Sequence, residues 1–199
     1  MDKGLAAEQN GVRLIKPIDT LEELLERANR HRIFGTKMRS VIHDADKDGV
    51  AAIADQQFEY AARISAAGLV PILEPEVSID SPRKDEAESL LRDALQTHIE
   101  ALPGDAAVML KLTIPTQPGR YAALGADPRV VRVLALSGGY SRDKACALLA
   151  RDPGMIASFS RALLEGLSDQ QTDEQFHAQL DASIGQIFDA SVEKVPVGG

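Results

Sequence analysis

Cysteine and histidine are scarce in this 199-residue chain. Cys146 is the only cysteine, so neither an intrachain disulfide nor a cluster of thiolate ligands can form. The histidines, His31, His43, His98 and His177, stand far apart and form no HxH or HExxH pair. The sequence therefore predicts a protein of a reducing compartment that uses no metal and no other cofactor.

Long apolar runs and an excess of basic residues are also missing. The longest apolar stretch, AAGLVPIL at 66–73, is too short to span a bilayer, and MDKGLAAEQNG is too polar for a signal peptide. The 22 Lys and Arg are outnumbered by 30 Asp and Glu, which disfavours a nucleic-acid surface. We expect a cytoplasmic protein whose partners include neither membrane nor nucleic acid. A small basic pocket for a phosphorylated metabolite and a homo-oligomer remain compatible with this charge.

Short apolar segments alternate with amphipathic ones along the chain. Nearly continuous apolar runs are typical of parallel strands covered on both faces, and they predict strands at 33–42, 68–77, 108–115, 130–139 and 155–160. The helical periodicity predicts helices at 20–31, 50–64, 90–99, 141–149, from about 161, and at 173–188. Thr20 and Glu23 are spaced as a capping box, and 190–199 reads as a frayed tail. The alternation predicts a single α/β domain with a parallel sheet.

Two common nucleotide motifs are absent from the strand ends. Neither GxGxxG nor GxxxxGK[ST] follows any predicted strand, which excludes the usual dinucleotide and P-loop sites. The only glycine pair beside a strand lies in SGG at 137–139, which by itself predicts no more than a tight turn.

Charged and polar residues recur towards the carboxyl ends of the predicted strands. They are Lys37 and Arg39, Glu74 and Glu76, Lys111, Ser137 and Arg161. A single charge in a strand is most often an edge residue, which keeps its head group in water. Five successive strands with polar groups at one end are harder to explain in this way, because buried charges need partners. The pattern favours a shared site.

Lys111 is the most unusual of these residues, because it interrupts the apolar strand VMLKLTIP at 108–115. Apolar surroundings and nearby cations favour a neutral amine, which attacks a carbonyl to give a Schiff base. A protonated imine withdraws electrons from the adjacent carbon–carbon bond. Glu74 can then move protons as a general acid and base. These residues predict carbon–carbon cleavage or formation beside a ketone.

Five segments together resemble the class I fructose-bisphosphate aldolases, above all the bacterial form of this Schiff-base family. They are FGTKMRS, GLVPILEPEV, VMLKLTIP, LALSGGYSRDKA and ASFSRAL, and the resemblance extends from DKGL to IFDASVEK. It implies a (β/α)8 TIM barrel. It also implies reversible cleavage of fructose 1,6-bisphosphate to dihydroxyacetone phosphate and glyceraldehyde 3-phosphate, in glycolysis and gluconeogenesis.

The resemblance also implies a role for each candidate residue. Lys111 would be the Schiff-base lysine, Glu74 the proton acceptor and donor, and Lys37 a cation that supports the carbon–carbon step. The surrounding charge network would contain Arg39 and Glu76. The phosphate of dihydroxyacetone phosphate would be bound by Ser137, Gly138, Gly139, Ser160 and Arg161.

The sequence departs from the family pattern in several places. Met38 stands where the animal enzymes have Trp, Ser160 where they have Gly, and KVPVGG lacks their terminal Tyr. Five strands are predicted where the family barrel has eight, and MDKGL resembles the segment just after the third strand. We therefore expect an incomplete barrel of about five βα units, strands 4 to 8, without an Asp and a Lys of the first three. On this expectation the chain alone is poorly stable or inactive, or needs a complementing N-terminal piece.

Two further functions fit the same residues. Another Schiff-base aldolase could use the phosphate loop for a different sugar phosphate. A noncatalytic remnant could bind a sugar phosphate or a partner protein.

Overall fold

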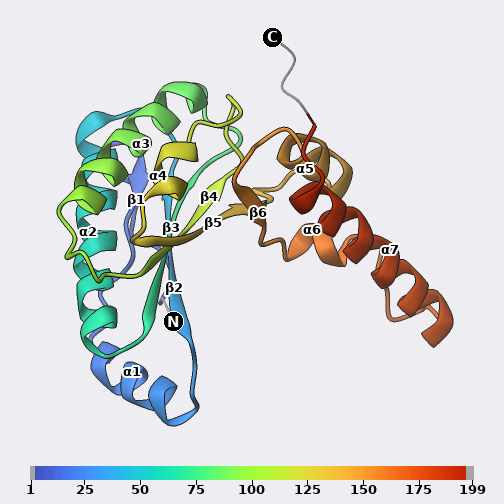
Figure 1. The fold of residues 1–199 in the computed structure, drawn as a ribbon, viewed down its shortest axis with the longest axis horizontal. Coiled ribbons are helices and arrows are strands. Elements are labelled where there is room, and N and C mark those ends of the chain that lie inside the picture. Colours follow the sequence, from blue (N-terminus) through green and yellow to red (C-terminus); the bar gives the residue numbers. More distant parts are fainter. Residues whose placement is uncertain (1–2, 196–199) are drawn as a thin grey trace.

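A six-stranded sheet forms the centre of the computed structural model, which describes residues 3–195 (Figure 1). The strands lie across the sheet in chain order, β2 to β6 in parallel and β1 antiparallel to β2. Their bounds are β1 (Val12–Arg13), β2 (Gly35–Ile42), β3 (Val70–Val77), β4 (Val108–Thr113), β5 (Val130–Leu136) and β6 (Met155–Ala157). The predicted α/β class with a mostly parallel sheet is therefore confirmed.

Helices alternate with the parallel strands. They are α1 (Leu21–Arg30), α2 (Lys47–Ala66), α3 (Lys84–Glu100), α4 (Ala122–Ala126), α5 (Arg142–Leu149), α6 (Arg161–Leu164) and α7 (Asp173–Val192). Figure 1 shows α2, α3 and α4 beside the sheet, with α5, α6 and α7 grouped next to β6. This second group projects from the sheet as an arm.

The two faces of the sheet differ in character. Successive residues of a strand point to opposite faces, so Met38 and Ser40 lie on one face of β2 while Lys37 and Arg39 lie on the other. Gln57 of α2 donates hydrogen bonds to the Met38 carbonyl and the Ser40 hydroxyl, which identifies the face that the helices cover. Fully buried side chains on the strands include Met38, Leu73, Leu110 and Leu112. The charges of the strands thus gather on the face opposite this core.

Some local elements differ from those predicted. The two-residue strand β1 and the five-residue helix α4 were not predicted, because elements so short carry no periodicity. β6 ends at Ala157 rather than at 160, since the chain then turns into α6. The predicted capping box at α1 is wrong: Thr20 has φ −106° and ψ 28°, which is not the extended conformation of a capping residue, and its hydroxyl makes no cap hydrogen bond. Such a box occurs instead at α7, between Thr172 and Gln175.

The end of the chain covers the free edge of β6. The backbone N–H of Ala157 donates to the Ser191 hydroxyl at 3.0 Å, and Lys194 donates to the Met155 carbonyl at 2.9 Å. The frayed tail predicted from residue 190 is therefore wrong for residues 190–195, because α7 continues to Val192 and Lys194 is anchored. Residues 196–199 lie outside the described part of the chain. Within residues 3–195, no helix combines the length and the apolar character needed to cross a bilayer.

Asp152 is a buried carboxylate on the loop before β6. It is only 1% exposed, and its Oδ2 accepts the Gly119 N–H at 3.2 Å. Its Oδ1 has no hydrogen-bond partner within the described residues. Burial raises the pKa of Asp152, and the Gly119 N–H only partly opposes this shift. The native state therefore holds this proton more tightly than the unfolded chain does.

The first prediction concerns the stability of Asp152→Asn, which keeps an acceptor for Gly119 but carries no charge. A raised native pKa stabilises the fold at low pH, and this contribution is lost as the pH rises through that pKa. The variant should match the parent at about pH 4 and become the more stable protein by about pH 7. Urea unfolding across this pH range measures the difference. A parent that is more stable at pH 7, with an advantage that disappears in acid, would contradict the assignment.

Candidate functional site

The charged face of the parallel strands and the loops after β5 and β6 line a hollow of about 460 Å³. Nine of the ten predicted site residues line it, which are Lys37, Arg39, Glu74, Glu76, Lys111, Ser137, Gly138, Ser160 and Arg161. The tenth, Gly139, lines an adjoining hollow that shares Arg161. The parallel sheet explains this convergence, because the same ends of β2 to β6 lie side by side along one edge.

Glu74 lies between two lysines at the centre of the hollow. Lys37 of β2 donates a hydrogen bond to Glu74 Oε2, and Lys111 Nζ of β4 lies 3.2 Å from Glu74 Oε1. The Glu74 side chain is only 5% exposed and that of Lys111 16%, so water screens this contact weakly. The carboxylate thus has one amine on each side, each supplied by a neighbouring strand.

A second ion pair lies next along the same two strands. Arg39 Nε donates to Glu76 Oε2, and Glu76 is buried. The register places Lys37 opposite Ile72 and Arg39 opposite Glu74, so each cation reaches the carboxylate two positions beyond its register partner on β3. This face of the sheet therefore carries cations and carboxylates next to one another. Their attraction compensates the desolvation free energy of burying two carboxylates.

The loop after β5 forms another wall of the hollow. Gly138 has φ +62° and Gly139 φ +112°, a region that favours glycine. A Cβ on Gly138 would lie 2.8 Å from Ile79 Cγ2, so space also limits this position. Ser137 is buried, whereas Ser160 and Arg161 are exposed at the start of α6. Successive backbone amides in such a turn form a concavity suited to an anion.

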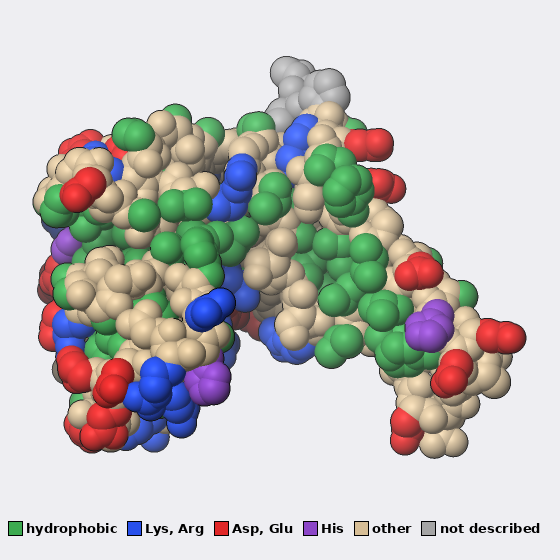
Figure 2. Space-filling view, turned by 60° about the horizontal axis from the view of Figure 1, so that its bottom comes forward, with side chains coloured by type: hydrophobic (Ala, Val, Ile, Leu, Met, Phe, Trp, Pro, Cys, Tyr) green, Lys and Arg blue, Asp and Glu red, His purple; other side chains and the backbone are tan. Residues whose placement is uncertain are grey.

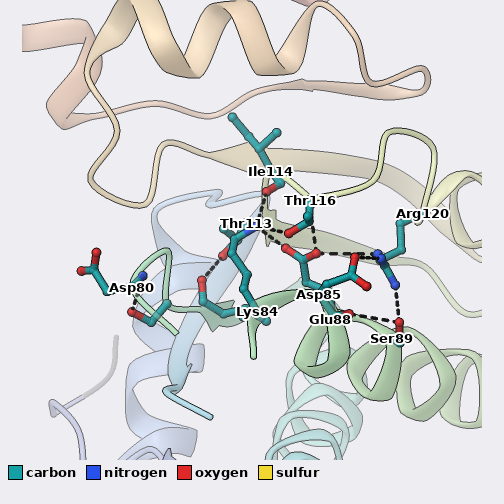
Figure 3. A network of polar contacts seen from close by, with 11 residues as sticks. Asp80, Lys84, Asp85, Glu88, Ser89, Thr113, Ile114, Thr116 and Arg120 are labelled. Carbon is teal, nitrogen blue, oxygen red and sulfur yellow. Dashed lines mark hydrogen bonds and ion pairs between the residues drawn. The ribbon is translucent and has the colours of Figure 1, made fainter. Parts of the chain in front are cut away.

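A buried polar network beside the hollow was not predicted (Figure 3). Glu88 is fully buried; its Oε1 accepts from Lys84 and its Oε2 from the Thr116 N–H at 2.9 Å. Lys84 also donates to the Ile114 carbonyl at 3.0 Å. Arg120 reaches Ser89 and lies 3.6 Å from Glu88. The network ties the start of α3 to the loop that follows the Lys111 strand. The i,i+4 spacing of Lys84 and Glu88 was its only signal in the sequence.

The described residues offer no alternative centre built on a metal ion. In the part of the chain that the structure describes, no three His, Cys, Asp or Glu side chains gather closely enough to hold a metal. The polar groups of the hollow are amines, carboxylates, hydroxyls and backbone amides. Such a set can bind an anion, move a proton and attack a carbonyl.

The second prediction is an energetic coupling between Lys111 and Glu74. Lys111→Met and Glu74→Gln should be non-additive, because each removes the same contact. The double variant should retain about 0.5–3 kcal/mol more free energy of unfolding than the sum of the single effects predicts. Denaturant unfolding of all four proteins measures this coupling. The matched control combines Lys111→Met with Glu26→Gln, at an exposed position of α1. Their effects on the free energy of unfolding should be additive within about 0.5 kcal/mol. Additivity in both cycles would contradict the central contact.

Comparison with known protein families supplies no identification. A scan of the chain against models of known families finds no match. The functional assignment therefore depends on the residues of the hollow and on their geometry.

Proposed function

We propose that this chain is a Schiff-base lyase of the class I fructose-bisphosphate aldolase type. One observation carries the proposal: the buried carboxylate of Glu74 lies between Lys37 and Lys111, with Lys111 Nζ at 3.2 Å. A carboxylate at this distance can accept a proton from the amine that must become neutral before it attacks a ketone. The substrate is fructose 1,6-bisphosphate. A glycolytic reaction of this kind takes place in the cytoplasm, which we propose as the location.

The proposed reaction uses each group of the central cluster. The neutral amine of Lys111 adds to the C2 ketone, and Glu74 returns the proton it took from the amine to the leaving hydroxyl, so that loss of water leaves a protonated imine. Glu74 accepts the proton of the C4 hydroxyl as the C3–C4 bond breaks. The electron pair of that bond moves into the imine to give an enamine. Glyceraldehyde 3-phosphate leaves, Glu74 returns a proton to C3, and water releases dihydroxyacetone phosphate. Lys37 stabilises the charge that develops beside Glu74.

The other wall of the hollow supports a phosphorylated substrate. Gly138 and Gly139 expose backbone amides, Ser137 adds a hydroxyl, and Arg161 lies across the same space. The volume of about 460 Å³ falls within the range of small-molecule sites. We propose that these groups, with Ser160, hold the phosphate of dihydroxyacetone phosphate.

We further propose that β2 to β6 are strands 4 to 8 of a (β/α)8 barrel. Doubly wound sheets reverse their strand order at a switch point, whereas here every strand neighbours the next in the chain. Helices cover one face, and the charges of the other face gather at the carboxyl ends, as in barrel enzymes. Closure requires more strands than the described sheet contains, since its two outer edges remain apart.

The open sheet also favours a second candidate function. If closure is needed to exclude water, the chain would bind a sugar phosphate without turning it over.

A Schiff-base aldolase with another phosphorylated ketose as substrate would use the same residues. Comparing cleavage of several ketose phosphates by the purified chain distinguishes these candidates.

The third prediction is covalent trapping at Lys111. Borohydride added with dihydroxyacetone phosphate should reduce the imine to a stable amine, which mass spectrometry of peptides locates on Lys111. Lys111→Met should give no adduct. Lys47→Met removes an exposed lysine at the start of α2 and should be labelled as fully as the parent. An undiminished adduct in Lys111→Met, or no adduct in the parent, would refute the Schiff base.

The fourth prediction concerns metal removal. The proposed steps use an amine and a carboxylate as the reacting groups, so EDTA should leave any cleavage rate unchanged. A coupled assay for glyceraldehyde 3-phosphate measures this rate. Loss of cleavage in EDTA that zinc restores would show a metal-dependent reaction instead.

A further inference from the structure

Helix α7 exposes a continuous apolar stripe. Phe176, Leu180, Ile184, Phe188 and Val192 recur every four residues, so each is the neighbour of the next in a row that winds along the helix. Phe188 is 61% exposed, Val192 54% and Ile184 48%. Figure 2 shows the hydrophobic side chains gathered along the projecting arm. We call these five residues the α7 stripe.

The side of α7 that faces its own chain packs through Ile187 and Ala190 and also through polar groups. Arg142 of α5 donates to the Ser183 hydroxyl at 2.7 Å and to Gln186 Oε1 at 3.0 Å. Gln186 in turn donates to Asp143 at 2.7 Å. A surface helix ordinarily buries its apolar face and exposes its polar one. The exposed row nevertheless indicates a partner outside the described residues, because a row of large apolar side chains is costly in water.

The charge around the stripe limits what that partner can be. α7 contains no Lys or Arg, and its acids are Asp173, Glu174, Asp181 and Asp189. A second α7 stripe would bring like charges together, which disfavours packing of stripe on stripe. The fitting partner is an apolar surface flanked by basic residues.

The same chain carries such a surface at the turn between α1 and β2. Ile33 is 50% exposed and Phe34 64%, and Arg27, His31 and Arg32 lie beside them in the sequence. The Ile33 N–H donates to the Ala28 carbonyl at 3.0 Å, so the turn is held against α1. We call these five residues the basic corner. In Figure 2 a group of Lys, Arg and His side chains lies at this end of the molecule, across an open notch from the arm.

We propose that the α7 stripe binds the basic corner of a second copy of this chain. α1 and α7 lie at opposite ends of the molecule, so the two surfaces cannot meet within one chain (Figure 1). A two-fold axis pairs the stripe of each copy with the corner of the other and closes the assembly as a dimer with two equal contacts. The basic corner lies at the amino end of β2, whereas the hollow lies at the carboxyl ends of the strands.

Light scattering during size-exclusion chromatography tests this proposal. The parent should be a dimer at about 100 µM, and both Phe34→Asp and Phe188→Asp should weaken the dimer about 30-fold or more. Both side chains are largely exposed, so circular dichroism should report unchanged folding. An equimolar mixture of the two variants should regain dimer, because one intact stripe then meets one intact corner. Val131→Asp replaces an exposed apolar residue outside both surfaces and should leave the dimer intact.

Other results would overturn the proposal. A parent that stays monomeric at this concentration would contradict binding to a second copy. Disruption by Phe188→Asp but not by Phe34→Asp would indicate stripe-to-stripe packing. Failure of the mixture to regain dimer would exclude the reciprocal contact between stripe and corner. A dimer whose dissociation constant does not change at high salt would exclude a contribution of charge pairing to the contact.

Discussion

Glu74 is a buried carboxylate, and its burial is possible because the strands on either side supply Lys37 and Lys111. Burying an isolated charge in this position would cost roughly several kcal/mol of desolvation free energy. The parallel register of β2, β3 and β4 is what places two amines beside one carboxylate. The ladder of charges then continues to Arg39 and Glu76. The open side of the sheet is organised around this compensation.

Ion pairs of this kind contribute little to stability, because apolar residues of the same volume often stabilise a core at least as well. Their concentration at one end of the sheet therefore favours a functional explanation over a structural one. The helix-covered face of the sheet, by contrast, is stabilised by apolar packing, with Met38, Leu73 and Leu110 fully buried. The network of Lys84, Glu88 and Arg120 joins the start of α3 to the loop where the strand of Lys111 ends.

The sequence predicted the elements with a long, regular pattern. β2 to β5 and α2 lie close to their expected positions, because long apolar runs and a long amphipathic pattern are strong local signals. The sequence also predicted that Lys37, Glu74 and Lys111 lie together, from their positions on the predicted parallel strands. β1 and α4 were missed since tertiary contacts, not periodicity, define such short elements. The Thr20 capping box failed for a similar reason: spacing predicts a box, but the backbone conformation of Thr20 decides whether it forms. The exposed apolar row of α7 was equally hidden, because a helix's sequence does not say which face meets its own chain.

A crystal structure of the chain soaked with dihydroxyacetone phosphate would test the central claim most directly. The account predicts continuous electron density from Lys111 Nζ to C2 of the ligand, a carboxylate of Glu74 within hydrogen-bond reach of the adduct, and the phosphate against Gly138 and Arg161. A ligand bound elsewhere, or one lying in the hollow with Lys111 still paired to Glu74 and unattached, would contradict it.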